Sequence, residues 1–286
     1  MKPLLRLAVQ KSGRLSEKSL ALLEECGIGF FHNNTRLRTE AFNFPMELLF
    51  LRDDDIPKYV ASGVADIGIV GENVLEEKGE VVELVHRLGF SKCRLSIAVP
   101  NKDNYENAGS LEGMKIATSY PHLLARFLQQ NRVSAEIHEI SGSVEVAPGI
   151  GLAHAICDLV SSGSTLLANG LKEVEVIFRS EAVLVSTPNL HSSKKEILDR
   201  LLFRIHSVLR AENYKYILMN VPNESIPLVA KYLPGMKSPT VMPLAEEGWS
   251  SVHSVIREDE FWEVIENLKS AGAQGILVAP IEKMVM

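Results

Sequence analysis

Residues 157–167 place a short loop of small hydroxyl residues directly between an apolar strand pattern and an apolar helix pattern. The strand pattern carries one acid, Asp158, and the loop that follows reads Ser-Ser-Gly-Ser-Thr over residues 161–165. A strand that passes through a tight loop into a helix is the building unit of an α/β sheet, and it gathers backbone N–H groups at a helix N-terminus. The stretch therefore predicts an anion-binding loop at the edge of an α/β sheet.

Asp158 adds a second requirement, because a carboxylate beside an anion site repels the anion and needs a different partner. Ribose hydroxyls and Mg²⁺ are partners suited to a carboxylate. A carboxylate for sugar hydroxyls next to an anion site for a sugar phosphate suggests a phosphoribosyl site. The local pattern is explained equally well by a buried strand followed by a helix with a Ser/Thr cap.

Strand and helix patterns alternate before and after this loop, and such βα alternation predicts largely parallel sheets with ligand sites at their carboxyl edges. Two lobes of this kind would hold a site in the cleft between them. In the first helix, we expect Ser16 to be the N-cap and Gly27 to follow the last turn. The predicted strands are 4–10, 46–52, 66–71, 81–88, 94–100, 114–119, 135–140, 155–160 and 174–186, and the predicted helices are 16–26, 53–62, 123–130, 152–156 and 166–171.

Lys11 and Arg14 lie in the loop between the first predicted strand and the first predicted helix. This loop belongs to the carboxyl edge of the sheet, where open α/β sheets bind ligands. Two cations at that edge suit a polyphosphate or pyrophosphate, although a solvated basic turn would have the same composition.

Three consecutive acids, Asp53, Asp54 and Asp55, begin another predicted helix. Acids at a helix N-terminus are favoured by the helix dipole, so they have a structural explanation. The alternative is a cluster suited to magnesium, which is the weaker of the two interpretations.

Composition excludes several classes of protein. A formal net charge of -6 and a pI near 5.8 argue against binding duplex nucleic acid. Three widely spaced cysteines (Cys26, Cys93 and Cys157) and eight scattered histidines form no disulfide or zinc pattern. No apolar run is long enough to cross a membrane, and no export signal precedes the first strand pattern. We therefore expect a cytoplasmic protein without a nucleic-acid or membrane partner.

The C-terminal part has a different pattern. A long amphipathic helix at 193–212 precedes strands and helices in the order βαββαβ. This order is that of the ferredoxin-like fold, and no nucleophile–base pair occurs in it. We expect a small regulatory or oligomerising domain. Its predicted strands are 214–222, 240–244, 252–257 and 275–280, and its predicted helices are 225–232 and 259–271.

Four longer segments are specific in combination. They are LRLAVQKSGRLSEKSLALLEECGI, RDDDIPKYVASGVADIGIVGENVLEE, EVAPGIGLAHAICDLVSSGSTLLANGL and LPGMKSPTVMPL. Together they resemble the long form of the ATP phosphoribosyltransferase family, over essentially the full chain. The resemblance implies a two-lobed α/β core like that of type II periplasmic binding proteins, plus an ACT-like ferredoxin-like domain that binds histidine. The implied lobes are 1–92 with 180–212 and 93–179, and the implied regulatory domain is 213–286.

The resemblance also implies a reaction, the first step of histidine biosynthesis. Phosphoribosyl pyrophosphate would transfer its phosphoribosyl group to N1 of ATP, with inversion at C1 and release of pyrophosphate. The implied enzyme requires Mg²⁺, is inhibited by histidine and also by AMP, and exists as a hexamer in equilibrium with dimers. No strong base is needed, because adenine N1 already has a lone pair and pyrophosphate is a good leaving group once its charge is neutralised.

Residue roles follow from the resemblance position by position. Asp158 would hold the ribose hydroxyls, and with Glu145 it would stabilise positive charge on the ribose rather than act as a base. Asn220 stands where some members have Asp, at the position implied to contact the amino group of histidine. The implied contacts of phosphoribosyl pyrophosphate are Asp158, Ser161, Ser162, Gly163, Ser164 and Thr165. The implied contacts of ATP are Lys11, Arg14, Asp66 and Tyr120, of which Lys11 and Arg14 are also implied to be catalytic. The implied contacts of histidine are Asn220, Met236, Ser238, Thr240, Val255 and Gly275.

Two other classes of protein share part of this pattern. A solute-binding protein would have the same two-lobed fold, but it has no need for the hydroxyl-rich loop at 161–165. An amino-acid sensor would explain the C-terminal domain, but it leaves Lys11, Arg14 and Asp158 without a role. Release of pyrophosphate from the two substrates, with and without histidine, distinguishes all three classes.

Overall fold

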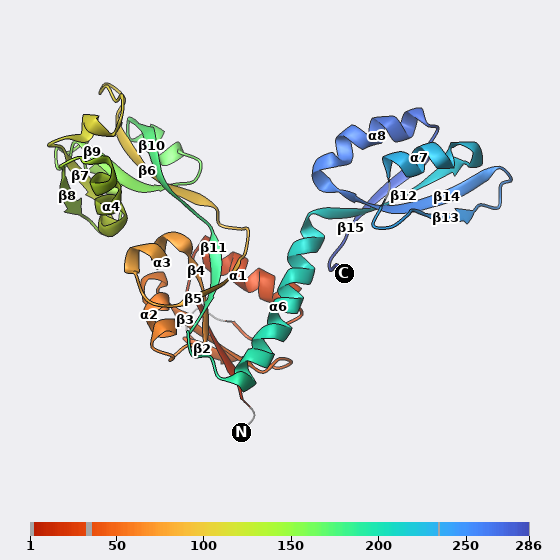
Figure 1. Cartoon of the computed structure of the whole chain (residues 1–286), viewed down its shortest axis with the longest axis horizontal. Coiled ribbons are helices and arrows are strands. Elements are labelled where there is room, and N and C mark those ends of the chain that lie inside the picture. Colours follow the sequence, from red (N-terminus) through yellow and green to blue (C-terminus); the bar gives the residue numbers. More distant parts are fainter. Residues whose placement is uncertain (1–2, 33–35, 234, 286) are drawn as a thin grey trace. The chain divides into compact units, whose positions relative to one another are not determined.

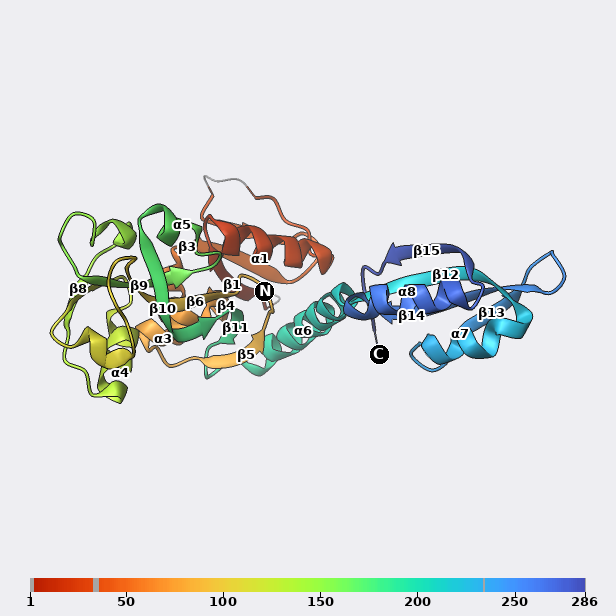
Figure 2. The same cartoon turned by 90° about the horizontal axis from the view of Figure 1, so that it is seen from above.

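The structure is a computed structural model that describes residues 3–32, 36–233 and 235–285. The chain divides into two compact units, Met1–Ala21 with Ile28–Ile197 and Leu22–Gly27 with Leu198–Met286. Among the described residues, the first unit contains two β-sheets and the second contains one (Figures 1 and 2). The two-lobed α/β core and the separate C-terminal domain are confirmed. The boundaries 1–92 with 180–212, 93–179 and 213–286 remain a prediction, since compactness alone groups residues 198–212 with the second unit.

The first sheet has six strands in the order β2-β3-β1-β4-β11-β5. β1 pairs in parallel with β3 and β4, whereas β2, β11 and β5 pair antiparallel with their neighbours. The carboxyl ends of β1, β3 and β4 therefore lie at one edge, where an α/β sheet binds its ligands. The strands are Leu5–Gln10 (β1), Arg38–Glu40 (β2), Met46–Leu51 (β3), Ile67–Gly71 (β4), Glu83–Arg87 (β5) and Ala182–Ser186 (β11).

The middle strands of this sheet are buried, as expected for parallel strands covered on both faces. Residues 7–9 of β1 and Ile67 of β4 have no exposed surface. A helix follows each of the three parallel strands and begins at the ligand-binding edge. These helices are Arg14–Glu25 (α1), Ile56–Ala61 (α2) and Glu72–Lys78 (α3), and the 3₁₀ turn Asp53–Asp55 precedes α2.

Gly68 permits α2 to pack closely on β4. A Cβ atom at Gly68 would lie 2.8 Å from Cγ2 of Ile56 and 2.9 Å from Cγ2 of Val60. Both of these side chains are fully buried. The absence of a side chain at Gly68 therefore sets the distance between this helix and the sheet.

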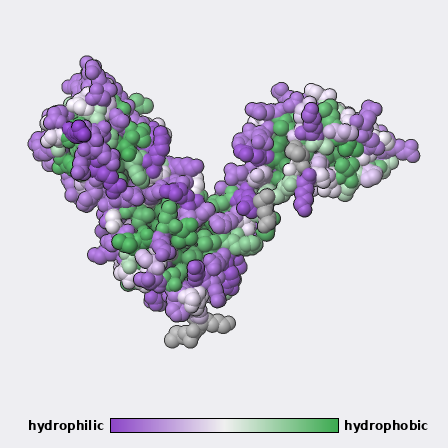
Figure 3. All heavy atoms as spheres, in the orientation of Figure 1, coloured by the Kyte–Doolittle hydropathy of each residue, from purple (hydrophilic) through white to green (hydrophobic). Residues whose placement is uncertain are grey.

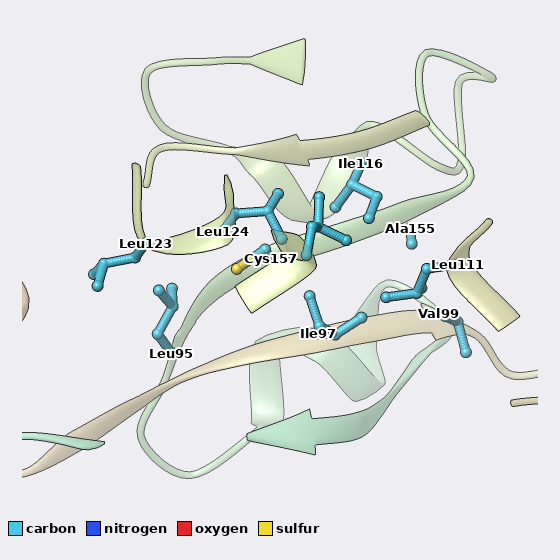
Figure 4. Close-up of a cluster of buried hydrophobic side chains, with 10 residues drawn as sticks. Leu95, Ile97, Val99, Leu111, Ile116, Leu123, Leu124, Ala155 and Cys157 are labelled. Carbon is cyan, nitrogen blue, oxygen red and sulfur yellow. The ribbon is translucent and has the colours of Figure 1, made fainter. Parts of the chain in front are cut away.

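The second sheet has five strands in the order β10-β6-β9-β7-β8. β7 pairs in parallel with β8 on one side and with β9 on the other. β6 runs antiparallel to both of its neighbours, β9 and β10. Separate buried clusters cover its two faces. Figure 4 shows one of them, in which side chains of β6, β7 and helix α4 gather around Cys157. The elements are Cys93–Pro100 (β6), Lys115–Thr118 (β7), Glu136–Glu139 (β8), Ala155–Val160 (β9), Leu171–Ser180 (β10), Pro121–Asn131 (α4) and Ser164–Ala168 (α5).

The C-terminal sheet has four antiparallel strands in the order β13-β14-β12-β15. This is the strand order of the ferredoxin-like βαββαβ fold, so the predicted arrangement is confirmed. One face packs on α7 and α8 through a cluster that includes Met219, Val252 and Leu268. The elements are Tyr214–Pro222 (β12), Ile226–Tyr232 (α7), Thr240–Pro243 (β13), Trp249–Arg257 (β14), Phe261–Ser270 (α8) and Gln274–Pro280 (β15), and α6 (Ser192–Glu212) precedes them.

Three details of the sequence-based prediction are wrong. The sheets are mixed rather than largely parallel, because β6, β10 and β11 each run against their neighbours. Residues 152–156 form no helix, since β9 already begins at Ala155 and pairs with β7, and a short apolar run does not distinguish the two states. Ser16 is not an N-cap, because α1 begins at Arg14, directly after Gly13 in the left-handed region.

The visible surface in Figure 3 mixes hydrophilic and hydrophobic residues. Among the described helices, none combines the length and the hydropathy that a membrane crossing requires.

Gly68→Ala should lower the stability of the first unit by about 1–3 kcal/mol, because the added methyl group overpacks the contact between α2 and β4. Urea denaturation of the full chain checks this expectation. Gly149→Ala is the matched control, since its Cβ would meet only the carbonyl oxygen of Val146, at 3.5 Å. Equal stability of the two variants would contradict the proposed packing role.

Candidate functional site

The predicted anion-binding loop lies between β9 and α5, as the sequence indicated. β9 is anchored because Ala155, Ile156 and Cys157 are fully buried. The chain then turns at Gly163, whose φ of +81° is accessible to glycine but strained for other residues. Ser164 begins the helix immediately after this turn. The loop is therefore fixed between a buried strand and a helix.

The loop offers several hydrogen-bond donors to one small cavity. The first amides of a helix have no intrahelical partner. At the start of α5, the Ser164 N–H donates over 3.5 Å to the Ser162 hydroxyl, so the loop gathers donors and hydroxyls at one place. The hydroxyls of Ser162 and Ser164 lie 3.0 Å apart. The cavity has a volume of about 200 Å³, which suits a phosphate group, and Arg14 adds a cation to it. It is lined by Arg14, Glu145, Asp158, Leu159, Val160, Ser161, Ser162, Gly163, Ser164, Thr165 and Leu166.

Asp158 and Glu145 bring two carboxylates to this loop cavity. Glu145 lies on a 3₁₀ turn, Val144–Val146, that contacts β9. Burial raises the pKa of Asp158; the N–H of Leu159, 2.7 Å from Oδ1, opposes the shift, and the charge of Glu145 adds to it. Because the ionised form of Asp158 is disfavoured without a ligand, a cation or a positively charged ligand would stabilise it.

A second cavity, of about 400 Å³, adjoins the first. Arg14, Leu159 and Ser161 line both cavities. Its other residues include the ends of β1 and β4, which agrees with a ligand site at the carboxyl edge. The larger size and the mixed apolar and cationic lining suit a nucleotide. The remaining lining residues are Gln10, Leu15, Lys18, Asp53, Gly71, Asn73, Val74, Ser91, Lys92, Cys93 and Tyr120.

Tyr120 is fixed in this nucleotide-sized cavity by a chain of hydrogen bonds. The side-chain amide of Asn73 donates to the Tyr120 hydroxyl at 3.0 Å, and the Ser180 hydroxyl donates to Oδ1 of Asn73 at 2.8 Å. Burial raises the pKa of Tyr120 well above its ordinary value, and the hydrogen bond from Asn73 opposes this shift. Tyr120 is therefore a neutral hydrogen-bonding residue rather than an ionised one.

Two residues predicted to contact ATP are not among those that line the cavities. Lys11 follows β1 with an exposed side chain, and its backbone N–H donates to Leu51. Asp66 precedes β4, at the opposite edge of the sheet from Arg14. Both oxygens of Asp66 lie 2.8 Å from Nζ of Lys194, and one of them accepts the Arg6 N–H. Asp66 therefore has a structural role, and the structure gives no support to its assignment to ATP.

The carboxylates at the two cavities are separated from one another rather than clustered. No group of three or more His, Cys, Asp or Glu residues suited to a metal occurs in the described residues. Mg²⁺ often takes only one or two protein carboxylates, together with phosphate oxygens and water. Asp53, Glu145 and Asp158 supply separate carboxylates to the two cavities.

The six residues predicted to bind histidine do not meet at one place within the chain. β13 carries Thr240 and β15 carries Gly275, and these strands are opposite edges of the sheet. Three strand spacings separate them, or about 14 Å. Asn220 lies beside Gly275, since a Cβ there would be 3.6 Å from Nδ2 of Asn220. Met236 and Ser238 precede β13, and Val255 lies on β14.

Sequence reasoning missed Asn73, Lys18 and Lys92, which line the second cavity. The position of Asn73 directly after a predicted strand was a usable signal, because it placed this residue at the ligand-binding edge. Lys92 gave no signal of this kind, since its place depends on how the chain crosses between the two sheets.

The fold and the site define a class, that of two-lobed α/β proteins of the periplasmic-binding-protein type with a hydroxyl-rich loop at the edge of one sheet. A family model described as ATP phosphoribosyltransferase matches residues 52–207, and one described as HisG, C-terminal domain, matches residues 211–283. The chain therefore belongs to the ATP phosphoribosyltransferase family, in the long form that carries the C-terminal domain. It acts in the first step of histidine biosynthesis, and its C-terminal domain implies feedback regulation by histidine.

Individual relatives agree with this family. The ATP phosphoribosyltransferase of Cytophaga hutchinsonii is 62% identical over 285 residues, which is 100% of both chains. That of Bacteroides fragilis is 58% identical over 283 residues, or 99% of this chain and 100% of the relative. A solved structure, the ATP phosphoribosyl transferase (HisG:HisZ) complex from Thermotoga maritima, matches with a TM-score of 0.64 and 28% identity, over 72% of this chain and 99% of that one.

Asp158→Asn should stabilise the ligand-free protein at neutral pH. The raised pKa of Asp158 in the folded state means that its ionised form costs stability above that pKa, and the cost disappears below the pKa of the unfolded chain. Asn removes the charge and keeps an acceptor for the Leu159 N–H. Thermal denaturation at several pH values should show a higher midpoint for the variant near neutral pH, and the difference should vanish below about pH 4. A pH-independent difference would contradict this account.

Proposed function

We propose that the loop cavity binds the phosphoribosyl group of phosphoribosyl pyrophosphate and that the adjoining cavity binds ATP. The observation that carries this proposal is the shared lining of the two cavities by Arg14, Leu159 and Ser161. Two ligands in these cavities are direct neighbours, as a transfer between them requires. Holding both reactants in this way removes much of the entropic barrier.

In this arrangement the 5-phosphate binds to the amides and hydroxyls of residues 161–165. Asp158 accepts hydrogen bonds from the ribose hydroxyls. Adenine N1 attacks C1 of the ribose with its lone pair, the bond from C1 to the pyrophosphate oxygen breaks, and pyrophosphate leaves with the bonding electrons. The alkylated adenine then loses a proton from its amino group to water. The product is N1-(5-phosphoribosyl)-ATP, with inverted configuration at C1.

Charge stabilisation is the main contribution of the side chains. Positive charge develops on the ribose ring as the bond to pyrophosphate lengthens, and Asp158 and Glu145 place two carboxylates in the same cavity. Arg14 offers a cation to the departing pyrophosphate at the junction of the two cavities, and Lys18 and Lys92 add cations on the ATP side. Mg²⁺, when bound, would neutralise the pyrophosphate, with Asp53, Glu145 and Asp158 as available protein ligands.

Histidine is proposed to bind to the C-terminal domain between two copies of the chain. Thr240 and Gly275 lie on opposite edge strands, so contact between unlike edges would bring their two residue sets together. Both edges expose apolar side chains, including Met242 on β13 and Leu277 on β15. Contact between unlike edges repeats around a ring, so it supports the expected hexamer, whereas the expected dimer would form through another surface. AMP, as an ATP analogue, would compete for the second cavity, and the reaction would take place in the cytoplasm.

A pyrophosphate-release assay tests the reaction. Release should require both ATP and phosphoribosyl pyrophosphate, and Asp158→Ala should lower kcat on the order of 100-fold, because it removes a carboxylate that stabilises the transition state. Circular dichroism should show an unchanged fold. Release from either substrate alone would contradict the proposal, as would unaltered kinetics of the Asp158→Ala enzyme.

Histidine inhibition tests the C-terminal pocket. Ser238→Ala and Thr240→Val each remove one hydroxyl from the proposed site, and we expect the histidine concentration for half-inhibition to rise about tenfold. Turnover without histidine is the reference for each variant. Ser270→Ala on α8 is the control, since its hydroxyl donates to Glu266 within the same helix. If the histidine response of Thr240→Val matched that of Ser270→Ala, the pocket would lie elsewhere.

A further inference from the structure

Arg94 on β6 links two segments of the second sheet through its guanidinium group. Nε and Nη2 donate to the two carboxylate oxygens of Glu173 on β10, and Nη1 donates to the backbone carbonyl of Ser161 at 3.0 Å. Ser161 lines the loop cavity, whereas Arg94 is not among the residues that line it. The guanidinium therefore holds the anion-binding loop from outside the cavity.

The carbonyl of Ser161 controls the direction of the next amide. In a planar trans peptide, the C=O of one residue and the N–H of the following residue point in opposite directions. By accepting from Arg94, the Ser161 carbonyl is directed toward the guanidinium, and the Ser162 N–H is directed away from it. The same contact keeps a carbonyl oxygen from turning toward a bound phosphate, which its negative dipole would repel.

Glu173 fixes the position of Arg94. Its carboxylate receives both parallel donors of the guanidinium fork, a geometry that only arginine provides. The Ser96 hydroxyl donates to Oε1 of Glu173 at 2.7 Å. The hydrogen bonds from Arg94 are the main cause of a lowered pKa for Glu173, so this carboxylate stays ionised at neutral pH. Ser96 lies directly opposite Asp158 in the pairing of β6 with β9. The hydrogen bonds that run from Ser96 through Glu173 and Arg94 to Ser161 therefore begin beside the proposed ribose site.

We propose that Arg94, held by Glu173, is a positioning residue that orients the loop 161–165 for the 5-phosphate of phosphoribosyl pyrophosphate. The inference depends on the proposed function of that loop. Arg94 does not touch the substrate in this account; it acts through the peptide between Ser161 and Ser162.

The test compares Arg94→Met, Arg94→Lys and Glu173→Gln with the parent enzyme as full chains. KM for phosphoribosyl pyrophosphate should rise about tenfold or more in Arg94→Met, because a hydrogen bond to a charged donor is lost. It should rise in Arg94→Lys as well, since lysine cannot hold Glu173 and the Ser161 carbonyl together. KM for ATP should stay at the parent value. The inhibition constant of ribose 5-phosphate, measured against phosphoribosyl pyrophosphate, should rise in parallel, because this probe contains the 5-phosphate but no pyrophosphate.

Glu175→Gln is the matched control on the same strand. Glu175 accepts the Tyr105 hydroxyl at 2.7 Å, and the Tyr105 ring packs against the buried cluster of Figure 4. This variant should leave both KM values unchanged. If Arg94→Met does not fold, as judged by thermal denaturation, Arg94→Lys and Glu173→Gln decide the question.

Two results would overturn the inference: an unchanged KM for phosphoribosyl pyrophosphate in the folded variants, or an equal rise of both KM values, which indicates general loss of structure. Failure of the parent enzyme to release pyrophosphate from its two substrates would instead reject the proposed function, whatever the variants do.

Discussion

A buried carboxylate, that of Glu77 on α3, holds the start of helix α4. Its two oxygens accept the backbone N–H groups of His122 and Leu123, each at 2.9 Å, and Glu77 is only 7% exposed. These amides would otherwise be unsatisfied, because the first turn of a helix has no internal acceptors for them. A negative charge placed at a helix N-terminus also interacts favourably with the helix dipole. Since Tyr120 directly precedes α4, and Asn73 lies one turn before Glu77, the geometry of the second cavity depends on this contact.

The site combines groups that oppose one another until ligands arrive. Asp158 and Glu145 repel each other, and burial further disfavours the charge on Asp158. The cations Arg14, Lys18 and Lys92 line the adjoining cavity. An empty cavity of this kind is unfavourable for the protein alone. In the proposed reaction, phosphates would balance the cations, and the positive charge that develops on the ribose in the transition state would balance the carboxylates. Placing such groups in advance is the usual source of electrostatic catalysis.

Local patterns were sufficient to predict most elements and the position of the hydroxyl-rich loop between a strand and a helix, because residues 157–167 are contiguous and all favour the same local structure. Arg14 was found in the same way, at the end of a strand. Asp66 was assigned to ATP from the family resemblance, although it stands at the start of its strand and therefore at the edge of the sheet opposite to Arg14. Arg94 and Glu173 are 79 residues apart, so their contact follows only from the pairing of β6 with β10. The placement of Thr240 and Gly275 on opposite edge strands follows from the ferredoxin-like order that the sequence predicted, whereas their assignment to one pocket came from the family resemblance alone.

The strand that carries Asp158 also carries Cys157. The thiol of Cys157 is stable in an apolar interior, whereas the carboxylate of Asp158 needs a polar surrounding. Cys157 belongs to the buried cluster of Figure 4, on one face of the sheet, and burial raises the pKa of its thiol. Ile156 and Val160, which stand two residues before and after Asp158, pack on the opposite face of the sheet. A slip of β9 by one residue would exchange these faces, burying a carboxylate in an apolar cluster and moving the thiol to the cavity. Both changes are unfavourable, so the apolar neighbours of Asp158 keep its register. The face on which this carboxylate lies is therefore determined in part by Cys157, which is buried in a cluster outside both cavities.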